Sequence, residues 1–150
     1  MQELLQVPTG FKFILYKFGP YSFDLSEELT ALRADDLLAF LVRHPNYGPA
    51  LVPTKTWQTF RGSYPITLAK YLDQVDFVVR TLGPKGVAEL ERVATALYVT
   101  RECDTEATVE DRARRLVELK PHVTLDLASA AVRESDQIAR RAAVHTLPND

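Results

Sequence analysis

The chain has 150 residues, of which 46% are hydrophobic and 25% are charged, a balance typical of one soluble globular domain with a sizeable core. Its net charge of −2 argues against a protein whose main task is to bind phosphate backbones. The single cysteine, Cys103, excludes an internal disulfide, and we find neither a secretory signal nor an apolar run long enough to cross a membrane. We therefore expect a single cytoplasmic domain over residues 1–150.

The opening segment, Met1–Pro8, is predicted to be the last turns of a helix that Pro8 and Gly10 end. A helix this short is marginal in water on its own. Either it packs on the rest of the domain or a longer helix precedes it upstream, and we favour the upstream helix.

Residues 11–18 are predicted to form a buried strand, because they are apolar except for two lysines. Gly19 and Pro20 predict a sharp turn after the strand. Glycine tolerates backbone angles that other residues resist, and proline prevents the strand from continuing. We expect the rest of the chain to be arranged around this strand and turn.

A helix is predicted next, over residues 24–36, with Asp24 and Glu27 as its cap. Its leucines recur at helical spacing, which indicates one apolar face. Two apolar runs follow, at residues 37–42 and 50–52, and the Pro-, Asn- and Gly-rich segment between them predicts a β-hairpin. A helix followed by a hairpin is the outline of a winged helix. Residues 53–64 show no clean period, and we expect an irregular, partly buried connection there.

From Pro65 onward the apolar residues recur in steps of three and four, which predicts a series of helices. Gly83 and Pro84 end the first helix, and Pro84 suits the start of the second. Thr108 with Asp111 is predicted to cap the third, and the fourth opens near residue 124. The predicted fold class is α+β, with a small antiparallel sheet, a winged-helix-like front half and a mainly helical rear half.

No constellation of residues in the sequence predicts catalysis. The histidines, His44, His122 and His145, lie far apart and match no metal-binding spacing. Cys103 has no nearby signature of a nucleophile. The segment Gly83–Gly86 lacks the glycine spacing of a phosphate-binding loop. We therefore predict a protein that is not an enzyme and has no metal or cofactor.

Nucleic-acid binding is the alternative that the winged-helix outline raises. The helix at residues 24–36 would enter the major groove, yet it carries five acidic residues against a single basic one, Arg33. A later basic group alternates with acidic residues and predicts an ion-paired surface helix. That group consists of Arg112, Arg114, Arg115 and Lys120. Nucleic acid is therefore disfavoured as a partner.

Aromatic residues concentrate before residue 65, and we expect most of them in the core. A few near turns, Tyr21, Tyr47 and Trp57, are candidates for an exposed apolar groove that binds a protein partner. The full set of candidate partner-binding residues is Tyr16, Phe18, Gly19, Pro20, Tyr21, Phe23, Tyr47 and Trp57.

Three motifs resemble those of a known family: Leu-Tyr-Lys-Phe-Gly-Pro-Tyr-Ser-Phe-Asp-Leu at residues 15–25, Ala-Thr-Ala-Leu-Tyr-Val at 94–99 and Leu-Lys-Pro-His at 119–122. They are similar to the YwgA-like bacterial and archaeal proteins, which are related to the SocA-like, or Panacea, antitoxin domain. Gly19, Pro20 and Tyr21 match the turn of this family residue by residue. Relatives usually begin with a full helix before the segment at residues 2–5, so the resemblance implies that this chain is truncated, that it starts late, or that it receives the helix from a partner.

The resemblance implies non-enzymatic work, since Panacea-type domains are similar to antitoxins that bind a toxin directly and SocA resembles an adaptor that delivers its toxin to a protease. It implies a protein partner, such as a toxin or a subunit of a defence complex, and leaves an oligomer open. We therefore predict a protein-interaction module acting in toxin control or phage defence. A winged-helix-like DNA-binding transcriptional regulator is the alternative.

Overall fold

The computed structural model describes residues 1–42 and 48–146. These residues divide by their contacts into two compact units. The first unit comprises Met1–Tyr21 together with Asp73–Asp150, and the second comprises Ser22–Leu72. The first unit is therefore built from two separate stretches of the chain. The prediction of one domain over residues 1–150 stays a prediction.

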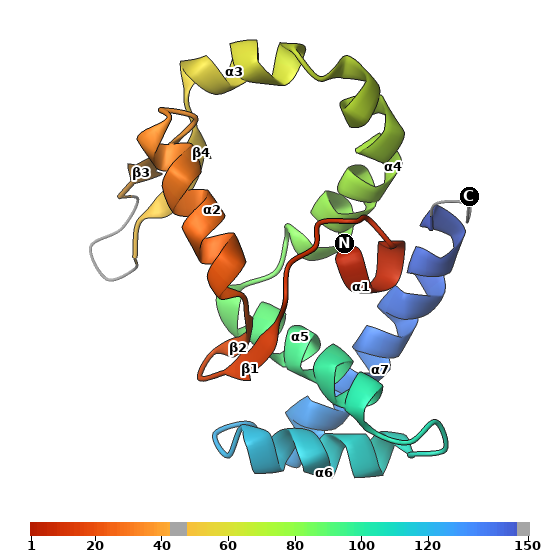
Figure 1. The fold of residues 1–150 in the computed structure, drawn as a ribbon. Coiled ribbons are helices and arrows are strands. Elements are labelled where there is room, and N and C mark those ends of the chain that lie inside the picture. Colours follow the sequence, from red (N-terminus) through yellow and green to blue (C-terminus); the bar gives the residue numbers. More distant parts are fainter. Residues whose placement is uncertain (43–47, 147–150) are drawn as a thin grey trace. The chain divides into compact units, whose positions relative to one another are not determined.

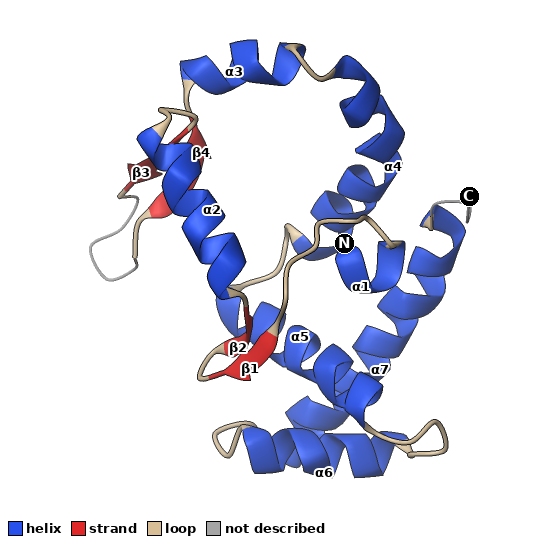
Figure 2. Cartoon of the chain, in the orientation of Figure 1, coloured by secondary structure: helices blue, strands red, loops and turns tan. Residues whose placement is uncertain are grey.

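Helices predominate in the described residues, and the strands form two short antiparallel pairs (Figures 1 and 2). The elements of the first unit are α1 (Gln2–Leu5), β1 (Ile14–Tyr16), β2 (Gly19–Tyr21), the later part of α4 (Pro65–Leu82), α5 (Val87–Glu102), α6 (Val109–Leu119), α7 (Leu125–Ala142) and the 3₁₀ helix η1 (Ala143–His145). The elements of the second unit are α2 (Phe23–Ala34), β3 (Leu38–Leu41), β4 (Ala50–Pro53), α3 (Lys55–Gly62) and the beginning of α4. The predicted α+β class is confirmed, with two small sheets of two strands each.

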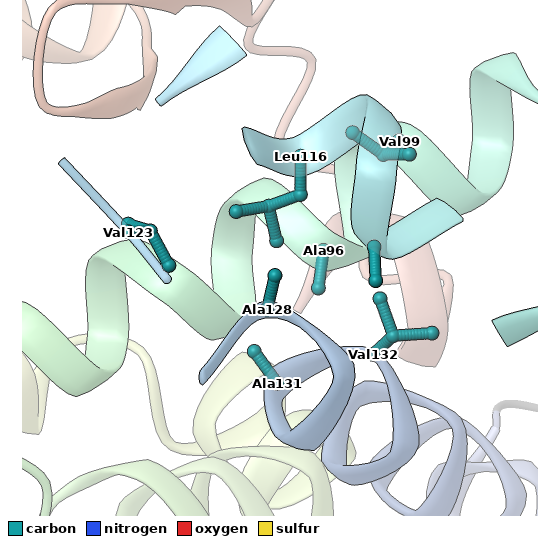
Figure 3. Packing of buried hydrophobic residues seen from close by; sticks show 8 residues of the cluster. Ala96, Val99, Leu116, Val123, Ala128, Ala131 and Val132 are labelled. Carbon is teal, nitrogen blue, oxygen red and sulfur yellow. The ribbon is translucent and has the colours of Figure 1, made fainter. Parts of the chain in front are cut away.

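The core of the first unit lies where α5, α6 and α7 pack together (Figure 3). Many of its side chains are small, so the helix backbones approach closely while leaving little room for voids. Leu116 of α6 is the largest member of this cluster and is fully buried. The cluster consists of Ala96, Val99, Ala113, Leu116, Val123, Ala128, Ala131 and Val132.

An arginine–carboxylate pair joins α6 to α7 beside this core. Arg112 donates from Nη1 to Oδ1 of Asp136 over 2.7 Å and from Nη2 to Oδ2 over 2.8 Å. This two-pronged geometry is the strongest form of the interaction. The hydrogen bonds with Asp136 raise the pKa of Arg112 above its usual value. The pair therefore fixes how the two helices sit against each other.

Local capping rules predicted the rear helices well. Thr108 Oγ1 accepts the backbone N–H of Asp111, and the Asp111 carboxylate accepts the backbone N–H of Thr108, each over 3.2 Å. The Thr108 hydroxyl also donates to this carboxylate, and these bonds lower the pKa of Asp111. Thr124 caps α7 as predicted. The start of α5 was predicted at Pro84 and lies at Val87 instead, because the Glu89 side chain accepts the backbone N–H of Gly86 and caps the helix there.

The β1–β2 hairpin (Ile14–Tyr21) differs from its prediction in two respects. The turn was predicted at Gly19 and Pro20, but both residues belong to β2, and the turn lies at Lys17 and Phe18. Pro20 is tolerated because a two-stranded sheet consists only of edge strands. The buried strand predicted over residues 11–18 is also wrong. The main contact of this hairpin with α5 is made by β2, and most of the side chains of the β1 stretch are exposed.

The second unit begins with α2, whose cap is Ser22 rather than the predicted Asp24. Ser22 has extended backbone angles, and its Oγ accepts the backbone N–H of Leu25 over 3.3 Å. The predicted hairpin after this helix is confirmed as β3 and β4, with Leu38 paired to Pro53 and Leu41 to Ala50. The helix-then-hairpin outline of the front half is therefore present.

The prediction of an irregular connection at residues 53–64 is wrong, because these residues include the helix α3. Thr54 caps this helix by accepting the backbone N–H of Trp57 over 3.3 Å. The aromatic residues Trp57, Phe60 and Tyr64 recur at helical spacing and contact one another in series, with ring centroids 6.0 and 5.1 Å apart. This aromatic stripe was the available signal for a helix.

The expectation that most front-half aromatic residues form the core is also wrong. Among the described residues before position 65, no aromatic side chain is fully buried. The physical reason is that the main core forms from small aliphatic side chains of α5, α6 and α7. The large aromatic side chains are left at or near the surface.

We predict that Leu116→Ala lowers the free energy of unfolding by about 2–5 kcal/mol, because it leaves a cavity in the tight contact of α5, α6 and α7. Val87→Ala is the matched control, since Val87 is 76% exposed, and it should change stability by no more than about 0.5 kcal/mol. Urea denaturation followed by circular dichroism measures both. Equal stability of the two variants would contradict this placement of the core.

Candidate protein-interaction site

The β1–β2 hairpin gathers most of the predicted partner-binding residues in one place. Tyr16 ends β1, and Gly19, Pro20 and Tyr21 form β2, with Tyr16 paired to Gly19 in the antiparallel register. Phe18 lies in the turn between the strands. Tyr16 is 58% exposed and Phe18 is 73% exposed, so the tip of the hairpin presents aromatic surface to solvent.

A buried lysine holds this turn from beneath. Lys120 follows the last residue of α6 and is only 4% exposed. Its ammonium group donates to the backbone carbonyl of Tyr16 over 3.1 Å and also to the backbone carbonyl of Lys17. The turn carbonyls are therefore satisfied by a side chain from the far end of the sequence.

Glu91 of α5 supplies the opposite charge. Its Oε1 lies 3.1 Å from Nζ of Lys120, which makes an ion pair, although the two atoms lack the alignment of a hydrogen bond. A buried charge without a partner is strongly unfavourable, so Lys120 requires both the carboxylate and the two carbonyls. We call Lys120, Glu91 and the carbonyls of Tyr16 and Lys17 the lysine clamp.

Gly19 fits the hairpin against α5. Its φ of 109° lies in a region that L-residues other than glycine rarely adopt. A Cβ at this position would lie 3.7 Å from Cγ of Glu91 and 3.8 Å from Oγ1 of Thr95, so the space itself would admit it. The backbone conformation, rather than crowding, is therefore the reason for glycine here.

The exposed face of the hairpin combines aromatic rings with one cation. The rings of Tyr16 and Tyr21 lie 5.7 Å apart between centroids, and Nζ of Lys17 lies 5.2 Å from the ring centroid of Phe18. Ile14, two residues before Tyr16 on the same strand, is also exposed. The result is a small apolar surface on a turn whose backbone is fixed.

The remaining candidates lie elsewhere. Phe23 begins α2 and Trp57 lies in α3, so both belong to the second unit. Phe23 is exposed, whereas Trp57 is half-buried and lines a hollow of about 240 Å³ within that unit. Tyr47 lies outside the described residues.

The prediction that the basic group lies on one ion-paired surface helix is correct in part. Arg114 pairs with Asp111 and Arg115 with Glu118 on the surface of α6. Arg112 and Lys120 are the exceptions, because Arg112 pairs with Asp136 of α7 and Lys120 is buried in the lysine clamp. Sequence reasoning missed Lys120 and Glu91 as supporting residues, since no local spacing links either of them to the hairpin.

The chemically reactive residue types are dispersed in the part of the chain that the structure describes. There, no group of three or more histidine, cysteine or acidic residues is placed to hold a metal ion. His145 Nδ1 lies 2.7 Å from Asp73, and exposed His122 lies 3.8 Å from Glu91. Cys103 is half-buried beside a hollow lined largely by acidic residues. Within the same residues, every helix is too short or too polar to span a membrane.

Comparison of the chain with protein-family models, with curated proteins and with solved structures found no match. The resemblance to the YwgA-like proteins therefore stays a prediction. What the hairpin can do must be argued from its own geometry.

We predict that Lys120→Met loosens the hairpin, because it removes the donor to the turn carbonyls and leaves the Glu91 carboxylate unpaired. Amide hydrogen exchange at residues 14–21 should become faster, and the free energy of unfolding should fall by about 3 kcal/mol. Lys12→Met replaces an exposed lysine and is the matched control. Adding Glu91→Gln to Lys120→Met should recover part of the lost stability. Unchanged hairpin exchange in Lys120→Met, measured by mass spectrometry, would refute the lysine clamp.

Proposed function

We propose that this chain is a non-enzymatic protein-interaction module that binds a partner polypeptide through the tip of the β1–β2 hairpin. The observation that carries the proposal is the exposure of Tyr16 and Phe18 on a turn whose carbonyls are held by the buried Lys120. In this proposal the module acts in the cytoplasm.

The energetics of association favour such a turn as a binding element. Burying one large apolar side chain contributes about 1.5–3 kcal/mol, and this gain is kept only if little conformational freedom is lost on binding. The lysine clamp fixes the backbone of Tyr16 and Lys17 before any partner arrives. Aromatic anchors on preorganised backbone are typical of the few residues that dominate an interface.

The resemblance to SocA-like and Panacea domains supports a more specific form of the proposal. In that form the partner is a toxin or a subunit of a defence complex, and the chain acts as an antitoxin or as an adaptor. Gly19, Pro20 and Tyr21, which carry the resemblance, lie in the hairpin that we propose as the binding element.

We expect affinity purification of the tagged chain from cells that produce it naturally to retain a stoichiometric protein partner. The double variant Tyr16→Ala/Phe18→Ala should bind that partner at least about tenfold more weakly by calorimetry, because it removes both aromatic anchors. Val144→Ala is the matched control, since Val144 is 82% exposed and lies outside the hairpin. Circular dichroism confirms that each variant is folded. A partner that binds the double variant with undiminished affinity, or the absence of any stable partner, would argue against the proposal.

DNA binding is the alternative function. The winged-helix outline of the front half favours it, but the negative charge of α2 disfavours it. The helix α2 exposes a row of carboxylates, and its Arg33 lies over the ring of Phe40, 3.6 Å from the centroid. Such a surface repels the phosphate backbone. The exposed acidic residues of α2 and its C-terminal end are Asp24, Glu27, Glu28, Asp35 and Asp36.

A mobility-shift assay with random-sequence duplex DNA distinguishes the two functions. We expect no retarded complex at low salt with the wild-type chain, since the counterion release that drives such binding needs clustered cations. The variant Glu27→Lys/Glu28→Lys serves as a charge-reversed comparison. A salt-dependent shift by the wild-type chain would favour the DNA-binding alternative.

A further inference from the structure

One long stretch of the second unit carries no negative charge. Between Asp36 and Asp73 the sequence contains no acidic residue, whereas Lys55, Arg61 and Lys70 are all present. Among the described residues, neither Lys55 nor Arg61 has an ion-pair partner, and both are exposed. The segment that contains α3 and the start of α4 is therefore locally basic.

A hollow of about 240 Å³ lies in this basic segment, lined by residues from the end of α3 and the beginning of α4. The helix α3 ends at Gly62, and α4 begins at Pro65. Between them the backbone N–H of Tyr64 donates to the carbonyl of Arg61 over 3.2 Å. The two helices thus meet at a short bend. The residues that line the hollow are Trp57, Gln58, Arg61, Gly62, Pro65 and Leu68.

The lining combines an apolar wall with a polar edge. Trp57, Pro65 and Leu68 supply the apolar wall, and Gln58 and Arg61 supply donors. Trp57 and Arg61 lie four residues apart on α3, so their side chains project from the same face of the helix. Arg61 can therefore pair with a carboxylate whose neighbouring apolar side chain enters the hollow.

Exposed apolar side chains extend this surface along both helices. Side chains of these types are usually buried, and a group of exposed apolar side chains typically marks an interaction site. The exposed apolar residues of the bend and of α4 within the second unit are Phe60, Tyr64, Ile66, Leu68 and Leu72.

We propose that this bend is a second docking surface, which binds an acidic amphipathic helical segment of a partner protein. Charge complementarity selects this occupant, because the hollow combines the Arg61 cation with apolar side chains and none of the residues that line it is acidic. In the docked state an apolar side chain of the segment fills the hollow between Trp57 and Leu68, and a carboxylate one turn away pairs with Arg61. This surface shares no residue with the β1–β2 hairpin.

A polyanion such as nucleic acid fits this surface less well. The aromatic rings of Trp57, Phe60 and Tyr64 contact one another in series, at interplanar angles of 31° and 49°, rather than standing apart to receive stacked bases.

Intrinsic fluorescence tests the proposal at the site itself, because Trp57 is the one tryptophan of the chain. The probe is a synthetic helical peptide of about 18 residues, or about five turns, with leucine on one face and glutamate on the other. A second peptide carries lysine in place of each glutamate, and a third probe is oligodeoxythymidylate. We expect the acidic peptide to cause a saturable change in Trp57 emission. Its affinity for the chain should be about tenfold higher than that of the lysine peptide.

Two variants locate the binding. Arg61→Glu should weaken the acidic peptide about tenfold and strengthen the lysine peptide, whereas Lys12→Glu in the first unit should do neither. Gly62→Leu should weaken the acidic peptide by filling the hollow, since a Cβ at Gly62 meets no atom within 4 Å and the fold accepts it. Thr59→Leu, exposed on the same helix and outside the hollow, is its matched control. Circular dichroism verifies the fold of each variant.

The outcomes separate this proposal from the function proposed for the hairpin. Tyr16→Ala/Phe18→Ala should leave the peptide titration unchanged, so loss of the natural partner in that variant does not affect this test. Equal affinity for the two peptides, absence of a Trp57 response, or tighter and steeply salt-dependent binding of oligodeoxythymidylate would each overturn the acidic-segment proposal.

Discussion

The lysine clamp is the interaction on which the candidate site depends. A single ammonium group, removed from solvent at Lys120, brings together the turn of the β1–β2 hairpin, the end of α6 and Glu91 of α5. A two-stranded hairpin is at best marginally stable by itself in water, so this one requires support from the helices. The positions of Tyr16 and Phe18 are therefore set by residues far from them in the sequence.

Side-chain size is distributed unusually between interior and surface. The contact of α5, α6 and α7 uses mainly alanine and valine, with Leu116 as its largest member, whereas aromatic rings remain exposed in both units. Small residues let helices approach closely, but they bury little apolar area each. Exposed aromatic side chains promote aggregation of an isolated protein, but they contribute binding energy when a partner covers them in a complex. This contrast is common to both surfaces for which we propose partners.

The features predicted correctly are those that local sequence rules govern. Thr108 with Asp111 and Thr124 cap their helices within a few residues of themselves, and apolar spacing is enough to identify the long rear helices. The candidate residue Tyr21 was identified from its type and its closeness to a predicted turn, whereas Tyr16 and Phe18 were placed in a strand that was predicted to be buried. The exposure of Tyr16 and Phe18 was misjudged, because an apolar run does not reveal that β2 makes the main contact of that hairpin with α5.

The supporting residues could not be predicted because they act over long sequence distances. Lys120 before a proline has the pattern of an ordinary helix end, and nothing near it indicates that its amine reaches the carbonyl of Tyr16. The helix α3 was missed because its stripe of Trp57, Phe60 and Tyr64 was interpreted as partly buried irregular chain. The hollow beside Trp57 arises only once α3 and α4 meet at Gly62, a junction that periodicity does not describe.

The discontinuous first unit has a consequence for biosynthesis. Residues 14–21 are translated before the second unit, whereas their partners Glu91 and Lys120 are translated only after it. Loop closure over such a separation is slow compared with local helix formation. The nascent hairpin therefore lacks the support of the lysine clamp until the end of α6 has been translated.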